Sequence, residues 1–262
     1  MSHLALRIEN QIATLTLRNP PGNRIDTTMV DELEVALDAI QASGARVTVV
    51  CAEGKDFCFG GDINPWPEMS NQALRGRFEH TMSVFNRFER LPMPVIAAVQ
   101  GLCFGGGLEL ALRADLIFAG SSATFGHPEQ TLGIVTLLGG VYRLAEKVGR
   151  ALAFEWALTS ERVPAATLER HGVVNRVVDD ADLMAETNAF AAKLAQGPTR
   201  AHAAHKALLR NWAVGGVGAA DEVMFDIAMP LFETEDVRNG LASAIDALRS
   251  GKPRPALTFN GH

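Results

Sequence analysis

The segment GLCFGGGLELALRADLIFAG, residues 101–120, indicates how the chain folds and where its chemistry lies. It follows the apolar run PVIAAVQG (94–101), which is typical of a buried strand, and it leads from three consecutive glycines into a helical pattern. The run ADLIFAG (114–120) is expected to form the next strand. Strand, glycine-rich loop, helix and strand in succession indicate parallel strands and an α/β fold.

The same arrangement occurs earlier in the chain. RVTVVCAE (46–53) predicts a buried strand, which is followed by the glycine-rich segment GKDFCFGGDI and a helix from about Asn71 to Arg90. The first segment, 4–20, alternates apolar and polar residues twice and predicts a β-hairpin, after which Asp26 or Thr27 is expected to cap a helix. Further along, GVVNRVV (172–178) predicts a strand, and ATFGHPE (123–129) is expected to be a loop.

The chain is expected to have two parts. Residues 1–195 read as an α/β core, and residues 196–262 read as a helical region, because the pattern from Asp180 onward is helical until GKPRPALTFNGH. The helical last third looks too extended to bury its apolar side chains alone, so we expect an oligomer.

The composition is that of an ordinary globular protein, with 47% hydrophobic and 21% charged residues among 262 and a formal net charge of −6. The absence of a basic run argues against nucleic-acid binding. No apolar run approaches the ~20 residues of a membrane span, and MSHLALRIEN lacks the features of a signal peptide. Three cysteines without a CxxC pair favour a reducing compartment. We therefore expect a soluble, cytoplasmic protein that binds neither nucleic acid nor membrane.

The two glycine-rich segments could supply backbone N–H donors. Glycine lets another molecule approach the backbone closely, and two N–H groups that converge on one oxygen would form an oxyanion hole. The alternative is a structural role in turning the chain. The segments match neither GxGxxG, nor the phosphate-binding GxxxxGK[ST], nor the nucleophile motif GxSxG.

Two acids accompany these loops. Glu109 lies among leucines and alanine, so it is expected to be partly buried with a raised pKa, although an i,i+4 ion pair with Arg113 is the alternative. Glu129 follows Pro128, which fits a first helical position, and a plain interaction with the helix N-terminus is its alternative. His127 is expected to be a structural hydrogen-bonding residue, and Trp66 a packing residue. His202 and His205 share a helix face, but no third ligand has suitable spacing, so no metal is predicted.

Four ordered segments resemble the crotonase superfamily, the enoyl-CoA hydratase/isomerase family. They are DFCFGGDI (56–63), residues 101–120, ATFGHPEQTLGI (123–134) and residues 148–178, and the similarity extends from about residue 4 to 250. The resemblance implies a crotonase-like spiral of ββα units and a helical C-terminal oligomerisation region, which packs as a homotrimer or a dimer of trimers. It implies an acyl-CoA thioester substrate and no cofactor, since coenzyme A belongs to the substrate.

Carried over by position, the resemblance assigns the thioester oxygen to the N–H groups of Gly61 and Gly106. Glu109 and Glu129 match the two catalytic acids, which favours hydration of a 2-enoyl-CoA. The alternatives are isomerisation, another acyl-CoA reaction such as hydrolysis or decarboxylation, and a non-catalytic acyl-CoA-binding subunit. Candidate substrate contacts are Phe59, Asp62, Ile63, Thr136 and Leu137.

The sequence departs from the family pattern in three places. Thr136 and Leu137 stand where a PGxGG-like turn would have Pro and Gly, which leaves the acyl-chain preference open. DINPW lacks the lysine that often follows the first glycine segment near the phosphates of coenzyme A. Ala244 replaces a frequent Phe near the C-terminus, where Arg249 or Lys252 could reach a phosphate.

Overall fold

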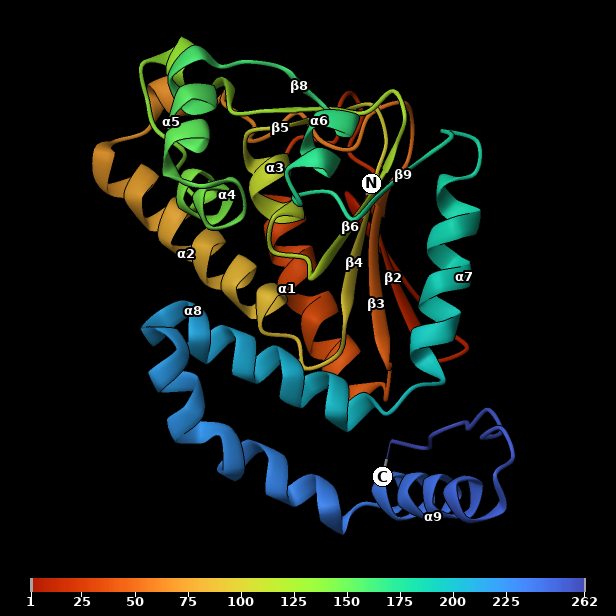
Figure 1. Cartoon of the computed structure of the whole chain (residues 1–262). Helices are drawn as coiled ribbons and strands as arrows, with labels where there is room; N and C mark the ends of the chain where they lie inside the picture. The colour runs from red at the N-terminus through yellow and green to blue at the C-terminus, as the bar shows by residue number, and fades with distance from the viewer. Residues whose placement is uncertain (1, 262) are drawn as a thin grey trace. The chain divides into compact units, whose positions relative to one another are not determined.

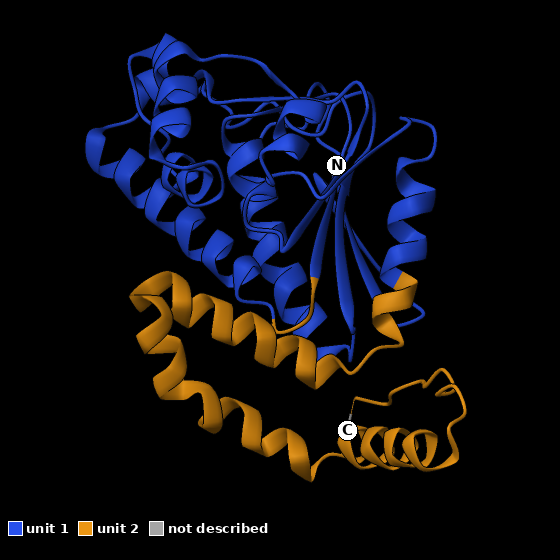
Figure 2. Cartoon of the chain, viewed as in Figure 1, with its two compact units in different colours: residues 1–91, 95–191 blue, residues 92–94, 192–262 orange. Residues whose placement is uncertain are grey.

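The computed structural model describes residues 2–261, which form two compact units (Figure 2). Unit 1 comprises the residues up to 91 and 95–191, and unit 2 comprises 92–94 and the residues from 192 onward. The boundary at 191 lies inside helix α7, and the division expected after residue 195 lies at the end of the same helix.

The elements of unit 1 alternate between strands and helices (Figure 1). The strands are β1 (Leu4–Glu9), β2 (Ile12–Leu17), β3 (Val47–Ala52), β4 (Val95–Val99), β5 (Leu102–Phe104), β6 (Leu116–Gly120), β7 (Thr124–Gly126), β8 (Val163–Pro164) and β9 (Arg176–Val178). The helices are α1 (Thr27–Ala42), α2 (Asn71–Glu89), α3 (Gly106–Ala111), α4 (Gly140–Val148), α5 (Arg150–Thr159), α6 (Ala165–Arg170) and α7 (Leu183–Ala195), with 3-10 turns η1 (Trp66–Glu68) and η2 (Pro128–Leu132).

A six-stranded sheet in the order β1-β2-β3-β4-β6-β9 forms the centre of unit 1. The first two strands pair antiparallel, with Leu4 opposite Leu17, and every later neighbour pair is parallel. All five residues of β4 are buried, as expected for a parallel strand covered on both faces. Figure 1 shows α7 on one side of this sheet and α1 with α3 on the other. The expected hairpin and α/β arrangement are therefore confirmed.

Local sequence explains the boundaries of α1. The side chain of Asp26 accepts a hydrogen bond from the Met29 N–H, which is the N-cap interaction expected from its position. The buried residues of α1 follow helical spacing and face the core: Met29, Val30, Leu33, Ala36, Leu37 and Ile40. Ser43 closes the helix, one residue before Gly44.

A second sheet, β5-β7-β8, corrects two expectations. Leu102–Phe104 and Thr124–Gly126 were expected to lie in loops, but they pair parallel, with Cys103 opposite Phe125. Strands of three residues carry too little alternation to be recognised in sequence, because their pairing depends on contacts distant along the chain. The strand expected over 172–178 is confined to Arg176–Val178, because the preceding valines are buried in a turn.

Unit 2 is helical, with α8 (Thr199–Ala228), 3-10 turn η3 (Met229–Glu233) and α9 (Glu235–Ser250). Helix α8 is interrupted at Gly216, which has a φ of 72°. Large apolar side chains are exposed along it and along α9, including Val214, Phe225 and Leu248. Among residues 2–261, no helix combines the length and the apolar character that a membrane crossing requires.

Candidate active site

Two glycine-containing loops meet at one edge of the six-stranded sheet. β3 and β4 are parallel neighbours, so the loops that follow them leave the same edge. The loops are joined by the bridge between Cys58 and Cys103, where the Phe104 N–H donates to the Cys58 carbonyl over 2.9 Å. This pairing brings Gly60 and Gly61 of the first loop against Gly105 and Gly106 of the second.

The N–H of Gly61 faces the second loop. Ile25 and Gly61 form an isolated parallel bridge, in which the Ile25 N–H donates to the Gly60 carbonyl and the Ile25 carbonyl accepts from the Asp62 N–H, both over 2.9 Å. In a parallel bridge these flanking groups point at the partner, so the Gly61 N–H points to the opposite side. A Cβ placed on Gly106 would lie 3.5 Å from that nitrogen.

The N–H of Gly106 is also available. Gly106 is the first residue of α3, a position whose N–H has no acceptor within its own helix. Gly105 precedes it with a φ of +51°, a conformation that favours glycine, and a Cβ on Gly60 would lie 3.2 Å from the Gly106 nitrogen. Within residues 2–261, neither the Gly61 nor the Gly106 N–H donates to a protein acceptor. Two neighbouring donors are therefore free to bind one external oxygen.

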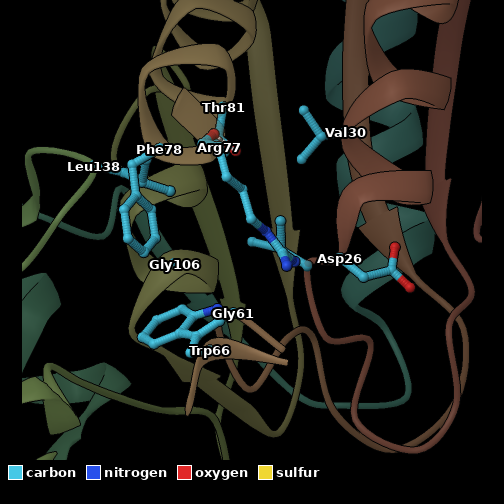
Figure 3. A pocket seen from close by; sticks show the side chains of 10 residues that line it. Asp26, Val30, Gly61, Trp66, Arg77, Phe78, Thr81, Gly106 and Leu138 are labelled. Carbon is cyan, nitrogen blue, oxygen red and sulfur yellow. Dashed lines mark hydrogen bonds between the residues drawn. The ribbon is translucent and has the colours of Figure 1, made fainter. Parts of the chain in front are cut away.

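A cavity opens at these two glycines (Figure 3). Its wall combines aromatic, aliphatic and polar side chains from the start of α1, the first glycine loop and α2 with one residue from the segment before α4. The lining residues are Ile25, Asp26, Val30, Gly61, Trp66, Arg77, Phe78, Thr81, Gly106 and Leu138. The indole of Trp66 packs edge-on against the ring of Phe78, with 5.2 Å between ring centroids. The cavity combines apolar walls with a few polar groups, which is the lining typical of a small-molecule site.

Glu109 is held beside this cavity as a hydrogen-bonded carboxylate. Its side chain is buried, and one carboxylate oxygen accepts from the N–H groups of Leu138, over 2.7 Å, and Gly140, over 2.9 Å. Burial raises the pKa of Glu109, and the two N–H donors oppose that rise. Arg113 donates to the backbone carbonyl of Glu109 rather than to its carboxylate, so the i,i+4 side-chain ion pair does not form.

Glu129 has a different environment. It lies in η2, directly after Pro128 at the first position, and its residue is 9% exposed. One oxygen, Oε2, has no hydrogen-bond partner within the described chain. Burial, reinforced by the charge of Glu109, raises the pKa of Glu129 to about 7. A Cβ on Gly105 would lie 3.1 Å from the other oxygen. A glycine at this position therefore leaves room for the Glu129 carboxyl group beside the second loop.

His127 is not the hydrogen-bonded structural residue that the sequence suggested. It is buried, and neither ring nitrogen has a hydrogen-bond partner within the described residues. Its Nδ1 lies 3.7 Å from Oε2 of Glu129, beyond hydrogen-bond distance. Burial lowers the pKa of His127 to about 4, so the imidazole is neutral near pH 7.

The structure brings Gly61, Gly106 and the two acids into one region, and the other candidate contacts lie in the segments beside them. Phe59 is half-buried and packs against Gly22. The carboxylate of Asp62 accepts from Asn64, and Ile63 is 39% exposed. Thr136 accepts from the Val141 N–H, and Leu137 is half-buried. None of these five residues, Phe59, Asp62, Ile63, Thr136 and Leu137, is among those that line the cavity.

Sequence reasoning missed several residues of the wall. Leu138 follows two candidates directly and both lines the cavity and holds Glu109 through its N–H. Trp66 was expected to be a packing residue only, yet it lines the cavity beside Gly61. Arg77 and Phe78 lie in α2, and helical periodicity alone does not distinguish a face that lines a cavity from a face in solvent.

The arrangement is suited to acid–base chemistry on a polarised carbonyl compound. Burial raises the pKa of both acids, but two N–H donors oppose that rise at Glu109, whereas the pKa of Glu129 is raised to about 7. A base and an acid thus stand next to two N–H groups that can stabilise negative charge on oxygen.

Comparison with known proteins identifies relatives over nearly the whole chain. A sequence profile of the family described as enoyl-CoA hydratase/isomerase matches residues 7–245. A probable enoyl-CoA hydratase of Rhizobium meliloti is 33% identical over 252 residues, which cover 94% of this chain and 96% of that protein. A carnitinyl-CoA dehydratase of Escherichia coli is 38% identical over 213 residues, covering 79% and 80%.

Solved structures show the same architecture. The crystal structure of enoyl-CoA hydratase subunit I from Geobacillus kaustophilus has a TM-score of 0.89 at 31% identity and covers 99% of this chain and 98% of that one. The expected fold, a spiral of ββα units followed by a helical C-terminal region, is therefore confirmed.

Proposed function

Because the chain belongs to the enoyl-CoA hydratase/isomerase family, we propose that it adds water across the 2,3 double bond of a 2-enoyl-CoA thioester. The observation that supports this proposal is a pair of buried acids with different hydrogen-bond partners beside two unpaired backbone donors. Glu109 accepts two N–H bonds, and Glu129 has an oxygen without a donor and a pKa near 7. Hydration needs a base that takes a proton from water and an acid that gives a proton to carbon, and both must lie beside the same double bond.

Glu109 takes the role of base in this proposal. Its N–H donors favour the ionised form and fix the carboxylate, which then accepts a proton from water as the oxygen attacks the β-carbon. Glu129 takes the role of acid and gives its proton to the α-carbon. Its raised pKa keeps that proton available near neutral pH. The two carboxyl groups interact, so measured pKa values belong to the pair.

The N–H groups of Gly61 and Gly106 hold the thioester oxygen. Attack at the β-carbon moves negative charge through the conjugated system onto that oxygen, and fixed donors stabilise the enolate more than the neutral thioester. Removal of one such donor typically costs ~10²–10³ in rate. The reverse reaction passes through the same transition state, so the same groups remove water from a 3-hydroxyacyl-CoA.

The test is loss of enoyl-thioester absorbance when the purified protein is mixed with crotonyl-CoA and longer 2-enoyl-CoAs. The substitutions Glu109→Gln and Glu129→Gln should each lower kcat by about 10² or more, since general acid–base groups contribute ~10²–10⁴. Glu155→Gln, in an exposed position of α5, is the matched control and should keep full activity. Unimpaired turnover in both active-site variants would exclude these acids from the mechanism.

Isomerisation is the second candidate function. It is supported by the segment at Thr136, whose hydroxyl accepts from the Val141 N–H in place of the expected Pro-Gly turn. Product mass separates the two reactions, because hydration adds one water and isomerisation leaves the mass unchanged. A shifted double bond without added water would favour isomerisation.

We also propose a homotrimer or a dimer of trimers. Helix α8 contains no buried residue, and Val214, Phe225 and Leu248 of unit 2 are more than two-thirds exposed, at 86%, 72% and 83%. A soluble protein rarely leaves so many large apolar groups in water unless a partner covers them. Light scattering at micromolar concentration should give a trimer or hexamer mass, and a monomer would refute the proposal.

A further inference from the structure

Arg77 is a cation of the cavity wall with no ionic partner in the described chain. The other arginines of its helix behave differently: Arg75 binds Glu79 at the surface over 2.7 Å, and Arg87 pairs with two acids of α1. Arg77 is half-buried and lines the cavity, and no ion pair or side-chain hydrogen bond holds its guanidinium within residues 2–261. Figure 3 shows its side chain extending from α2 into the space between Gly106 and Asp26.

The carboxylate nearest in the wall does not neutralise Arg77. Asp26 caps α1 by accepting from the Met29 N–H, and its carboxylate lies 2.9 Å from Nδ1 of His3. Its amide partner on the same side is Asn19, over 3.3 Å. In Figure 3 the Asp26 carboxylate points away from Arg77. The guanidinium of Arg77 is therefore the charged group of this wall that has no partner in the described chain.

A second unpaired donor lies in the same wall. The indole nitrogen of Trp66 is buried and has no acceptor in the described residues. A Cβ on Gly61 would lie 3.3 Å from Cζ2 of that indole, the ring atom next to the carbon that bears the nitrogen. A buried N–H without an acceptor costs ~1–3 kcal/mol, so a ligand that brings an acceptor gains from meeting it.

We propose that the acyl group of the substrate ends in a carboxylate, which Arg77 binds and the Trp66 indole N–H helps to position. This inference rests on the proposed function, because it takes the N–H groups of Gly61 and Gly106 as the place of the thioester oxygen. The same cavity contains these two glycines, Arg77 and Trp66, so an acyl group whose thioester oxygen meets the glycines enters the space that Arg77 and Trp66 line. A purely apolar acyl chain would leave both donors unpaired, whereas a carboxylate satisfies a guanidinium in its preferred geometry.

The phosphates of coenzyme A are the other source of negative charge. The pantetheine arm separates those phosphates from the thioester, whereas Arg77 lines the same cavity as the glycines that face the thioester. The acyl carboxylate is therefore the occupant that fits. Binding of free coenzyme A distinguishes the two sources, because it contains the phosphates and lacks the acyl group.

The experiment compares three thioesters that differ at the end of one four-carbon chain. They are crotonyl-CoA, 4-carboxybut-2-enoyl-CoA and 4-trimethylammoniobut-2-enoyl-CoA, which are neutral, anionic and cationic. The wild-type protein should prefer the anionic substrate in kcat/KM by roughly 10- to 100-fold over the neutral one, the range expected for one charged hydrogen-bonded contact. The cationic substrate should be the poorest, because it meets Arg77 as a like charge.

Variants assign the preference to the side chains. Arg77→Met should remove the preference for the anionic over the neutral thioester, and Arg77→Lys should restore part of it. Trp66→Phe, which keeps an aromatic ring but removes the N–H, should reduce the preference less. Arg75→Met on the solvent-facing side of the same helix is the control and should retain the wild-type ratio.

A binding measurement separates this proposal from the proposed reaction. Calorimetry with the saturated pair 4-carboxybutanoyl-CoA and butanoyl-CoA needs no turnover, and the wild type should bind the first more tightly by about tenfold or more. Equal affinity for the pair would overturn the proposal even if hydration is observed. The proposal would also be overturned if Arg77→Met lowered the affinity for free coenzyme A and for all thioesters by the same factor, since Arg77 would then bind a phosphate. Retained selectivity without any turnover would instead reject hydration alone.

Discussion

Replacing Glu129 by glutamine should stabilise the protein in a way that depends on pH. Glu129 is 9% exposed, and burial together with the charge of Glu109 raises its pKa from the ordinary 4.5 to about 7. Folding therefore favours the protonated carboxyl group, and the ionised form is costly in the native site. Glutamine is neutral at every pH, so the variant does not incur that cost.

The magnitude follows from the two pKa values. Below about pH 4.5 the carboxyl group is protonated in both the unfolded and the folded chain, so the favourable contribution of the wild-type residue is fully present. It is lost as pH rises through the folded value of about 7. A difference of about 2.5 pH units corresponds to about 3.5 kcal/mol at ~1.4 kcal/mol per unit, most of which falls between pH 4.5 and 8. The stability of Glu129→Gln relative to wild type should thus rise by about 3 kcal/mol between pH 4.5 and 8, and then level off.

Urea unfolding followed by circular dichroism, at about pH 5 and about pH 8.5, measures this difference. Protein concentration must be equal throughout, because assembly shifts apparent stability. The control is Glu155→Gln, whose exposed side chain should give a stability difference that does not change with pH. If the stability gain of Glu129→Gln were the same at both pH values, or fell as pH rose, the native carboxyl group would not have the raised pKa on which the proposed acid depends.

Three further outcomes are expected. The kcat/KM for hydration should fall about tenfold per pH unit above about pH 7, as Glu129 loses its proton, and a pH–rate profile that stays flat to pH 9 would contradict its role as acid. Gly140→Ala places a Cβ into the His127 ring and 2.9 Å from Cγ of Glu109. The kcat should therefore fall at least about tenfold, while the far-ultraviolet circular dichroism spectrum stays unchanged. An unchanged kcat would show that this packing does not position Glu109. Gly76 is exposed in α2, and no atom lies within 4 Å of a Cβ added there. Gly76→Ala should therefore raise the unfolding free energy by about 0.5–1 kcal/mol in urea titrations. A lower unfolding free energy would contradict the helical geometry at this position.

Sequence predicted the parts of the fold whose signal is local. The alternation in residues 4–17 predicts the hairpin, and the buried β-branched run before the first glycine loop predicts β3. The Asp26 cap follows from one side chain and its neighbouring backbone. The three-residue strands β5 and β7 could not be predicted in this way, because each exists only through its pairing with the other.

The candidate site shows the same limit. Gly61, Gly106 and the two acids could be proposed because they lie in motifs that are read along the chain. Burial raises the pKa of Glu109, and the N–H groups of Leu138 and Gly140 oppose that rise. These two N–H groups belong to the backbone about 30 residues away, so no side chain in the sequence indicates them. Arg77 could not be assigned to the cavity from helical periodicity, since its unpaired state is a property of three-dimensional neighbours.

The neutral His127 beside Glu129 is compatible with an acid that stays protonated. Both groups are buried, and the two ring nitrogens of His127 and Oε2 of Glu129 lack hydrogen-bond partners in the described chain, although Nδ1 and Oε2 are only 3.7 Å apart. A protonated imidazole at that distance would favour the carboxylate and lower the pKa of Glu129, but burial lowers the pKa of His127 to about 4 and leaves it neutral. A neutral neighbour adds burial without adding charge, so it raises the pKa of the acid in the same way as an apolar residue. Its ring N–H can still approach Oε2 once Glu129 has given up its proton, because a shift of less than about 1 Å reaches hydrogen-bond distance.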